Sequence, residues 1–83
     1  MSYTFYTDPG HGWLEVPVSE LVALGIADKI SAYSYRDGAM AYLEADCDLT
    51  RFAIAKGWQS IPDSVVSIYQ ETTPIRNYNR FYI

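Results

Sequence analysis

The segment YSYRDGAMAYLE, residues 33–44, constrains the fold of this chain more than any other stretch. Its Asp37-Gly38 dipeptide is a preferred two-residue turn of β-hairpins, and aromatic and polar residues alternate around it. Such alternation places the side chains of a strand on two faces, of which one can be buried. The segment therefore predicts a hairpin with strands at 32–36 and 39–44.

Two more strands and a turn are expected near the N-terminus. Residues 3–7, YTFYT, are β-branched and aromatic, which is typical of a strand. The run DPGHG then reverses the chain, because Pro9 fixes the first turn dihedral and the Asp8 carboxylate can accept hydrogen bonds from the following backbone amides. The run WLEVP predicts a strand at 13–16, which Pro17 ends.

Two segments predict short helices. The run VSELVALGI offers a Ser- or Thr-type cap position, helix-forming residues and Gly25 as a stop, which predicts a helix at about 18–24. Residues 48–56 begin with acidic side chains and end with Lys56, which is the polarity that a helix dipole favours.

The last third of the chain gives weaker signals. The run VVSIY at 65–69 predicts a strand, with a short helix capped by Asp63 or Ser64 as the alternative. The run PIRNYNRFYI at 74–83 predicts a strand or an extended tail. The expected fold is α+β: a single domain, residues 1–83, in which a small, mostly antiparallel sheet has two short helices packed on one face.

Length and composition fit one small globular domain. The chain has 83 residues, of which 49% are hydrophobic and 16% aromatic, and eight of its aromatic side chains are tyrosines. A chain of this length buries only about 60% of the surface that its unfolded form exposes, so one modest core is the limit. Tyrosine buries a ring and keeps a hydroxyl for a partner, so such a domain can fill its core and still present contact surface.

The sequence contains no signal for a membrane or for secretion. No apolar run approaches the roughly 20 residues of a membrane span, and the first residues, MSYTFYTD, do not resemble a signal peptide. The single cysteine, Cys47, cannot form an internal disulfide, in agreement with a reducing compartment. We expect a cytoplasmic protein without a membrane partner.

The charges are divided unevenly along the chain, whose net charge is −4. Residues 1–50 carry eight acidic and two basic side chains, whereas residues 51–83 carry two acidic and four basic ones. Lys and Arg contacts to phosphate supply most of the affinity for nucleic acids, so we expect no direct nucleic-acid binding. An acidic body is compatible with a basic surface on a partner protein.

The only histidine and the only cysteine offer little catalytic chemistry. A zinc site needs three or four ligands, and His11 and Cys47 stand in no metal-binding spacing. A Cys47–His11 nucleophilic pair is conceivable, but Asp46 and Asp48 would raise the pKa of the thiol between them. We expect no metal, no cofactor and no catalytic residue, with His11 as a turn residue and Cys47 half-buried.

Two other patterns have structural explanations. Asp46 and Asp48 have the first spacing of an EF-hand loop, but its glycine and its final glutamate are missing, and helix capping explains the two acids better. The alternation of Arg and Tyr over residues 76–82 resembles a base-stacking strand, but two arginines make only a weak basic patch. An edge strand explains that alternation better.

Several runs also carry a family resemblance. YTDPGHGWLEVP, ELVALGIADKISAYSYRDG, AYLEADCD and PIRNY together resemble a family of short, mostly uncharacterised proteins of proteobacteria and of their phages and mobile elements. The resemblance spans nearly the whole chain and departs chiefly in residues 57–73. It implies no enzymatic activity. Small acidic proteins of mobile elements include many anti-CRISPR inhibitors, so the resemblance suggests such an inhibitor, acting in the cytoplasm of a bacterial host cell.

The first functional hypothesis is an inhibitor that binds a host defence complex. CRISPR surveillance complexes expose basic channels for nucleic acid, which an acidic domain can occupy and block. This hypothesis expects one contiguous acidic face built from Glu15, Glu20, Asp28, Asp37, Glu44, Asp46 and Asp48. The partner-binding residues expected to matter most are Asp37, Glu44, Asp46 and Asp48, with Tyr33, Tyr35 and Tyr42 as exposed anchors.

The second hypothesis is a small enzyme or ligand-binding domain. It would use the DPGHG loop together with Cys47, and it expects a pocket that joins Asp8, His11 and Cys47.

Overall fold

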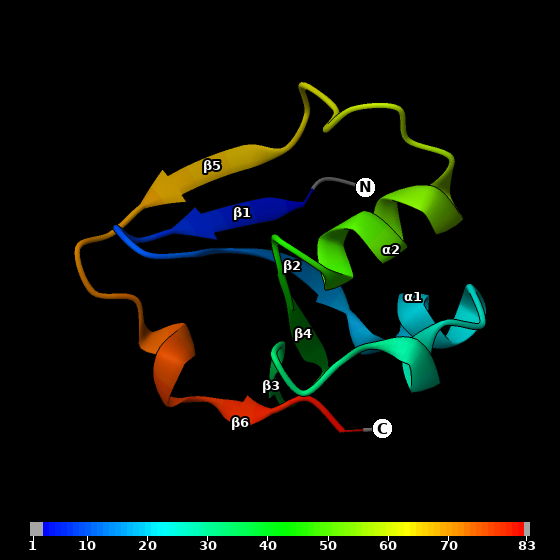
Figure 1. Ribbon diagram of the computed structural model, residues 1–83, viewed down its shortest axis with the longest axis horizontal. Coiled ribbons are helices and arrows are strands. Elements are labelled where there is room, and N and C mark those ends of the chain that lie inside the picture. Colours follow the sequence, from blue (N-terminus) through cyan, green and yellow to red (C-terminus); the bar gives the residue numbers. More distant parts are fainter. Residues whose placement is uncertain (1–2, 83) are drawn as a thin grey trace.

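Backbone hydrogen bonds join the strands of this protein into one mixed sheet. The strands are β1 (Thr4–Thr7), β2 (Gly12–Pro17), β3 (Tyr35–Asp37), β4 (Met40–Glu44), β5 (Val66–Tyr69) and β6 (Asn79–Arg80). The computed structural model describes residues 3–82, in which these six strands follow the order β5-β1-β2-β4-β3-β6 (Figure 1). Only β1 and β5 pair in parallel within this range. The fold is α+β with a mostly antiparallel sheet, as predicted.

Both predicted helices are present and begin at the predicted residues, but neither is capped as predicted. The helices are α1 (Val18–Ala23) and α2 (Asp48–Lys56), and two short 3₁₀ turns are η1 (Ala27–Lys29) and η2 (Pro74–Asn77). The residues that precede the helices are Pro17 and Cys47, and neither helix has a side-chain capping hydrogen bond. The expected caps are therefore wrong. At the other end of α2, Gly57 adopts a φ of 75°, the left-handed conformation that commonly ends a helix.

The hairpin turn lies one residue later than predicted. Asp37 pairs with Met40, so the two turn residues are Gly38 and Ala39 rather than Asp37 and Gly38. Gly38 has a φ of 59°, whereas Ala39 has a negative φ. Glycine at the first central position is the pattern of a type II′ turn, which suits the twist of the strands as well as the expected type I′ turn does.

Other boundaries also depart from the predictions. The strand expected at 32–36 begins only at Tyr35, because the backbone N–H of Ser34 donates to Ser31 in a turn. The strand predicted within residues 74–83 is much shorter than expected. Residues 74–77 form η2, and β6 has two residues. The segment 65–69 is a strand, β5, and not the alternative helix.

The main core lies between the helices and one face of the sheet. β2 and β4 contribute Leu14, Val16, Ala41 and Leu43, which are cross-strand partners on this face. The helices add Val18, Leu21, Leu49 and Phe52 to the same cluster. Figure 1 shows α1 and α2 on the same side of the sheet. The prediction that both helices pack on one face is confirmed.

The opposite face of the sheet carries a second, mostly aromatic cluster. Trp13, Tyr42 and Ile75 are buried in it, and Tyr35 and Tyr78 pack against it. Its cover comes from the segment of η2, which lies across the sheet from the helices (Figure 1). Within residues 3–82, this face is covered by the short η2 segment and not by an α-helix, which leaves room for a site.

A buried aspartate joins α2 to the turn before β3. Asp48 is 1% exposed, and its carboxylate accepts hydrogen bonds from the backbone N–H and hydroxyl of Ser31 and from the hydroxyl of Ser34. The Ser34 hydroxyl oxygen in turn accepts a hydrogen bond from the backbone N–H of Glu44. The prediction of Asp48 as a surface-binding or capping acid is wrong, because its carboxylate is occupied inside the protein.

None of the helices within residues 3–82 combines the length and the apolar character that crossing a membrane requires.

Replacing Asp48 with alanine should lower the free energy of unfolding by about 2–3 kcal/mol, since buried donors of Ser31 and Ser34 lose their acceptor. Asp46→Ala is the matched control, because Asp46 is exposed and a surface change of this kind costs about 0.5 kcal/mol or less. Urea denaturation followed by tryptophan fluorescence measures both variants. Equal losses in the two variants would contradict the structural role of Asp48.

Candidate functional site

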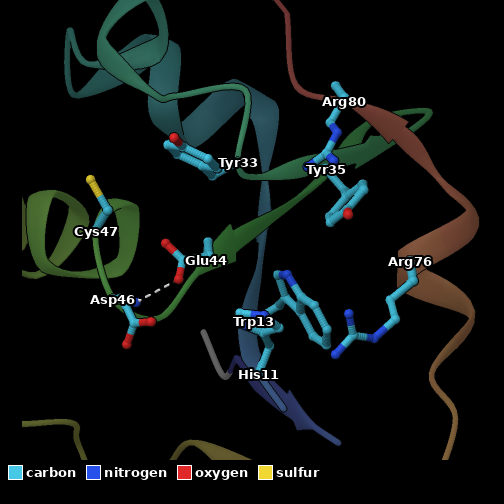
Figure 2. A pocket seen from close by; sticks show the side chains of 9 residues that line it. All are labelled: His11, Trp13, Tyr33, Tyr35, Glu44, Asp46, Cys47, Arg76 and Arg80. Carbon is cyan, nitrogen blue, oxygen red and sulfur yellow. Dashed lines mark hydrogen bonds between the residues drawn. The ribbon is translucent and has the colours of Figure 1, made fainter.

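A pocket of about 570 Å³ opens on the sheet face opposite the helices. Nine side chains line it, namely His11, Trp13, Tyr33, Tyr35, Glu44, Asp46, Cys47, Arg76 and Arg80. In Figure 2, Glu44, Asp46 and Cys47 lie on one side of the pocket, Arg76 and Arg80 lie on the other, and Trp13 lies between them. A volume of this size is within the range of small-ligand sites.

The turn between β1 and β2 positions His11. The Asp8 carboxylate accepts hydrogen bonds of 2.9 Å from the backbone N–H groups of Gly10 and His11. The backbone N–H of Asp8 donates to the carbonyl of His11 at 2.9 Å. The turn bonds predicted for Asp8 are confirmed, and they fix the backbone of His11 while its side chain stays exposed.

Asp8 also fixes the basic side of the pocket. Its side chain is 3% exposed and forms an ion pair with Arg76, with N–O distances of 2.6 and 2.9 Å. The guanidinium group of Arg76 lies over the Trp13 ring, 5.3 Å from its centroid. Hydrogen bonding to Arg76 holds the pKa of Asp8 well below its usual range, and the bonds from Gly10 and His11 lower it further, although burial opposes them.

The turn between β4 and α2 positions the acidic side of the pocket. The backbone N–H of Ala45 donates to the carbonyl of Gly12 at 2.9 Å, which joins this turn to the His11 turn. The backbone N–H of Asp46 donates to the carboxylate of Glu44 at 3.1 Å. Ligand atoms of His11, Glu44 and Asp46 all lie within 4.8 Å of one another.

The second arginine packs on an aromatic ring. Arg80 lies over Tyr35 at 4.8 Å from the ring centroid and donates a hydrogen bond to the carbonyl of Ala32. The Arg and Tyr alternation over residues 76–82 therefore does not build a base-stacking strand, because both arginines stack on rings of their own protein.

Four of the predicted partner-binding residues line this pocket: Tyr33, Tyr35, Glu44 and Asp46. Asp37 is exposed at the end of β3, away from the lining residues.

The prediction of Tyr42 as an exposed anchor is wrong. Tyr42 is 7% exposed, and its hydroxyl donates to Glu15 at 2.8 Å. Burial raises the pKa of the Tyr42 hydroxyl, and the hydrogen bond to Glu15 raises it further. Tyr42 is therefore a core residue of the open face, because its position in β4 places it against Tyr6 and Tyr78.

The expected contiguous acidic face is not formed. Asp48 is buried. Glu20 belongs to α1, where it accepts hydrogen bonds from Tyr3 and forms an ion pair with Lys56 at 2.7 Å. Those contacts with Lys56 and Tyr3 outweigh burial and lower the pKa of Glu20. Glu15, hydrogen-bonded to Tyr42, lies on the open face, on the other side of the sheet from Glu20.

The pocket contains residues that the sequence analysis had set aside or missed. His11 and Cys47 both line it, and Cys47 is exposed rather than half-buried. Asp8 does not line it but supports it through Arg76. Trp13 was missed: it lies opposite Glu44 in the register of β2 and β4, which the sequence does not encode.

No family model, no curated protein and no solved structure matches this chain.

The Asp8–Arg76 ion pair should make stability depend on pH. A carboxyl group whose pKa is depressed by folding stabilises the protein above its unfolded pKa, about 4, and this stabilisation is lost as pH falls toward the folded pKa. Asp8→Asn should therefore lower the melting temperature near neutral pH, and the difference from wild type should shrink below pH ~4.

Thermal unfolding followed by circular dichroism at several pH values measures this difference. Asp63→Asn is the control, because Asp63 is exposed and should leave the curve unchanged. A deficit of Asp8→Asn that stays constant from neutral to acidic pH would show that the charge of Asp8 is not what stabilises the protein.

Proposed function

We propose that this protein is a non-enzymatic inhibitor that uses the pocket to bind a basic segment of a bacterial defence complex. The proposed partner is a CRISPR surveillance complex, whose channels for nucleic acid are rich in Lys and Arg. Occupation of such a channel would prevent nucleic acid from entering it. The family resemblance suggests the kind of partner, and the pocket suggests how the protein would bind it.

The observation that carries the binding mode is the acidic side of the pocket. Among residues 3–82, neither Glu44 nor Asp46 forms an ion pair with a basic side chain. Tyr33 lines the same pocket and is 71% exposed. Carboxylates beside an open aromatic ring suit a Lys or Arg side chain, which gains both charge pairing and a cation–π contact.

The basic side of the pocket does not favour a nucleic acid as the ligand. The charge of Arg76 is offset by Asp8, and Arg80 is stacked on Tyr35. A phosphate entering the pocket would also face Glu44 and Asp46. A protein ligand with its own mixed charges fits this arrangement better.

Catalysis by His11 and Cys47 has less support than binding. A general base is normally oriented by a hydrogen bond to its second ring nitrogen. Within the described part of the chain, no hydrogen bond orients the imidazole of His11. The pocket is therefore proposed to bind and not to catalyse.

Reversing both pocket charges, Glu44→Lys with Asp46→Lys, should abolish inhibition. The assay uses a panel of bacterial strains, each with one active CRISPR–Cas type and a spacer against the test phage, and measures plaque formation. Wild-type protein should restore plaques in at least one strain, and the double variant should not. With the purified complex of that type, the variant should lose about 2 kcal/mol, or roughly 30-fold in Kd.

Asp63→Lys is the matched control, since it reverses an exposed acidic residue outside the pocket. Circular dichroism establishes that each variant remains folded. If wild-type protein restores plaques in no strain, the defence-complex proposal fails. If the double variant remains folded and inhibits as well as wild type, the acidic side of the pocket is not the binding surface.

A further inference from the structure

We infer that His11, Glu44 and Asp46 form a binding site for a divalent transition-metal ion such as Zn²⁺. The three side chains line the pocket and come from distant parts of the sequence: His11 from the turn between β1 and β2, Glu44 from the end of β4, and Asp46 from the turn after β4. The inference concerns the free protein and does not depend on the proposed partner.

The distances suit a shared ion after a small adjustment. One ligand atom from each of His11, Glu44 and Asp46 lies within 4.8 Å of the other two. Zinc bonds to nitrogen and oxygen are about 2.1 Å long, so two ligands of a tetrahedral ion are about 3.4 Å apart. The side chains must therefore close by up to about 1.4 Å, which rotation about the side-chain bonds of the exposed His11 and Asp46 and the half-exposed Glu44 provides.

The register of β2 and β4 explains why these residues meet. Trp13 pairs with Glu44, and the backbone bond from Ala45 to the carbonyl of Gly12 extends this pairing by one residue. His11 and Asp46 lie directly beyond these residues, in the turn before β2 and in the turn after β4. Glu44 is on the open face because it pairs with Trp13, and His11 and Asp46 line the same pocket on that face.

The backbone around the site is held in place before any ion binds. Two hydrogen bonds connect the backbone of His11 with Asp8, and one joins Gly12 to Ala45. The carboxylate of Glu44 has one oxygen bonded to the backbone N–H of Asp46, which leaves its second oxygen for a metal. Preorganised ligands lower the entropy cost of binding.

Of the two arginines that line the pocket, Arg80 stacks over Tyr35 and lies across the pocket from Glu44 and Asp46 (Figure 2). Arg76 lines the same pocket, but its charge is offset by Asp8 at 2.6 Å. The two carboxylates of the site carry negative charge that no basic side chain within residues 3–82 neutralises through an ion pair.

The donor set points to the class of metal. One imidazole nitrogen and two carboxylate oxygens suit Zn²⁺, Co²⁺, Ni²⁺ or Mn²⁺ better than Ca²⁺ or Mg²⁺, which prefer oxygen ligands alone. Three protein ligands leave at least one coordination position for water or for a group of another molecule. A bound ion would also neutralise Glu44 and Asp46, so it would compete with a basic segment for the same carboxylates.

Isothermal titration with ZnCl₂ in a non-coordinating buffer tests the site. Wild-type protein should bind one ion, and His11→Ala and Asp46→Asn should each weaken binding by about tenfold or more. Cys47→Ser is the first control, because its thiol lines the same pocket and could bind zinc by itself. Asp37→Asn is the second control, since Asp37 is an exposed acid outside the pocket. Both controls should bind zinc as wild type does.

A second measurement needs no variant. In an NMR titration of wild-type protein, substoichiometric Mn²⁺ should first broaden the amide signals of residues near His11 and Asp46. The inference fails if zinc shows no saturable binding up to about 1 mM, if His11→Ala binds as wild type does, if Cys47→Ser loses binding, or if the broadening lies elsewhere. None of these results bears on inhibition of a defence complex, which the plaque assay measures separately.

Discussion

The buried carboxylate of Asp8 is the contact on which the open face of this protein depends. It joins residues 68 positions apart in the chain, because it bonds the backbone of its own turn and forms an ion pair with Arg76. Through the turn it fixes the backbone of His11, and through Arg76 it fixes the cation that lies over Trp13. One side chain thus positions both the turn that carries His11 and the arginine on the basic side of the pocket.

Much of the fold followed from local signals in the sequence. Helix α2 has the predicted bounds, and the strand at β5 was predicted from its β-branched residues. The errors arose where a distant contact overrode a local preference. Asp48 was predicted to cap a helix, but its buried carboxylate accepts hydrogen bonds from the hydroxyls of Ser31 and Ser34 instead. The hairpin turn lies one residue later than predicted, because Asp37 pairs with Met40 and so belongs to the strand.

The site was less predictable than the fold, for a physical reason. Glu44 and Asp46 were predicted from their position between a strand and a helix, Tyr33 and Tyr35 as exposed anchors, and all four line the pocket. That choice could not separate them from Tyr42, which sits on the same face but is buried against other tyrosines. Whether an acid and a histidine meet depends on strand register and on which turn approaches which, and no local pattern encodes either.

The strand order has a consequence for how the pocket is assembled. β5 and β6 are the two edges of the sheet, so the last third of the chain runs as a strap from one edge, across the open face, to the other. Hairpins between near neighbours close with less loss of chain entropy than pairings between distant segments. The acidic side of the pocket belongs to the end of β4 and the turn after it, whereas both arginines belong to the strap. If the strap alone separated from the sheet, the pocket would lose its basic side and keep its acidic side. The charge that a ligand meets therefore depends on the contacts that hold the strap on the open face.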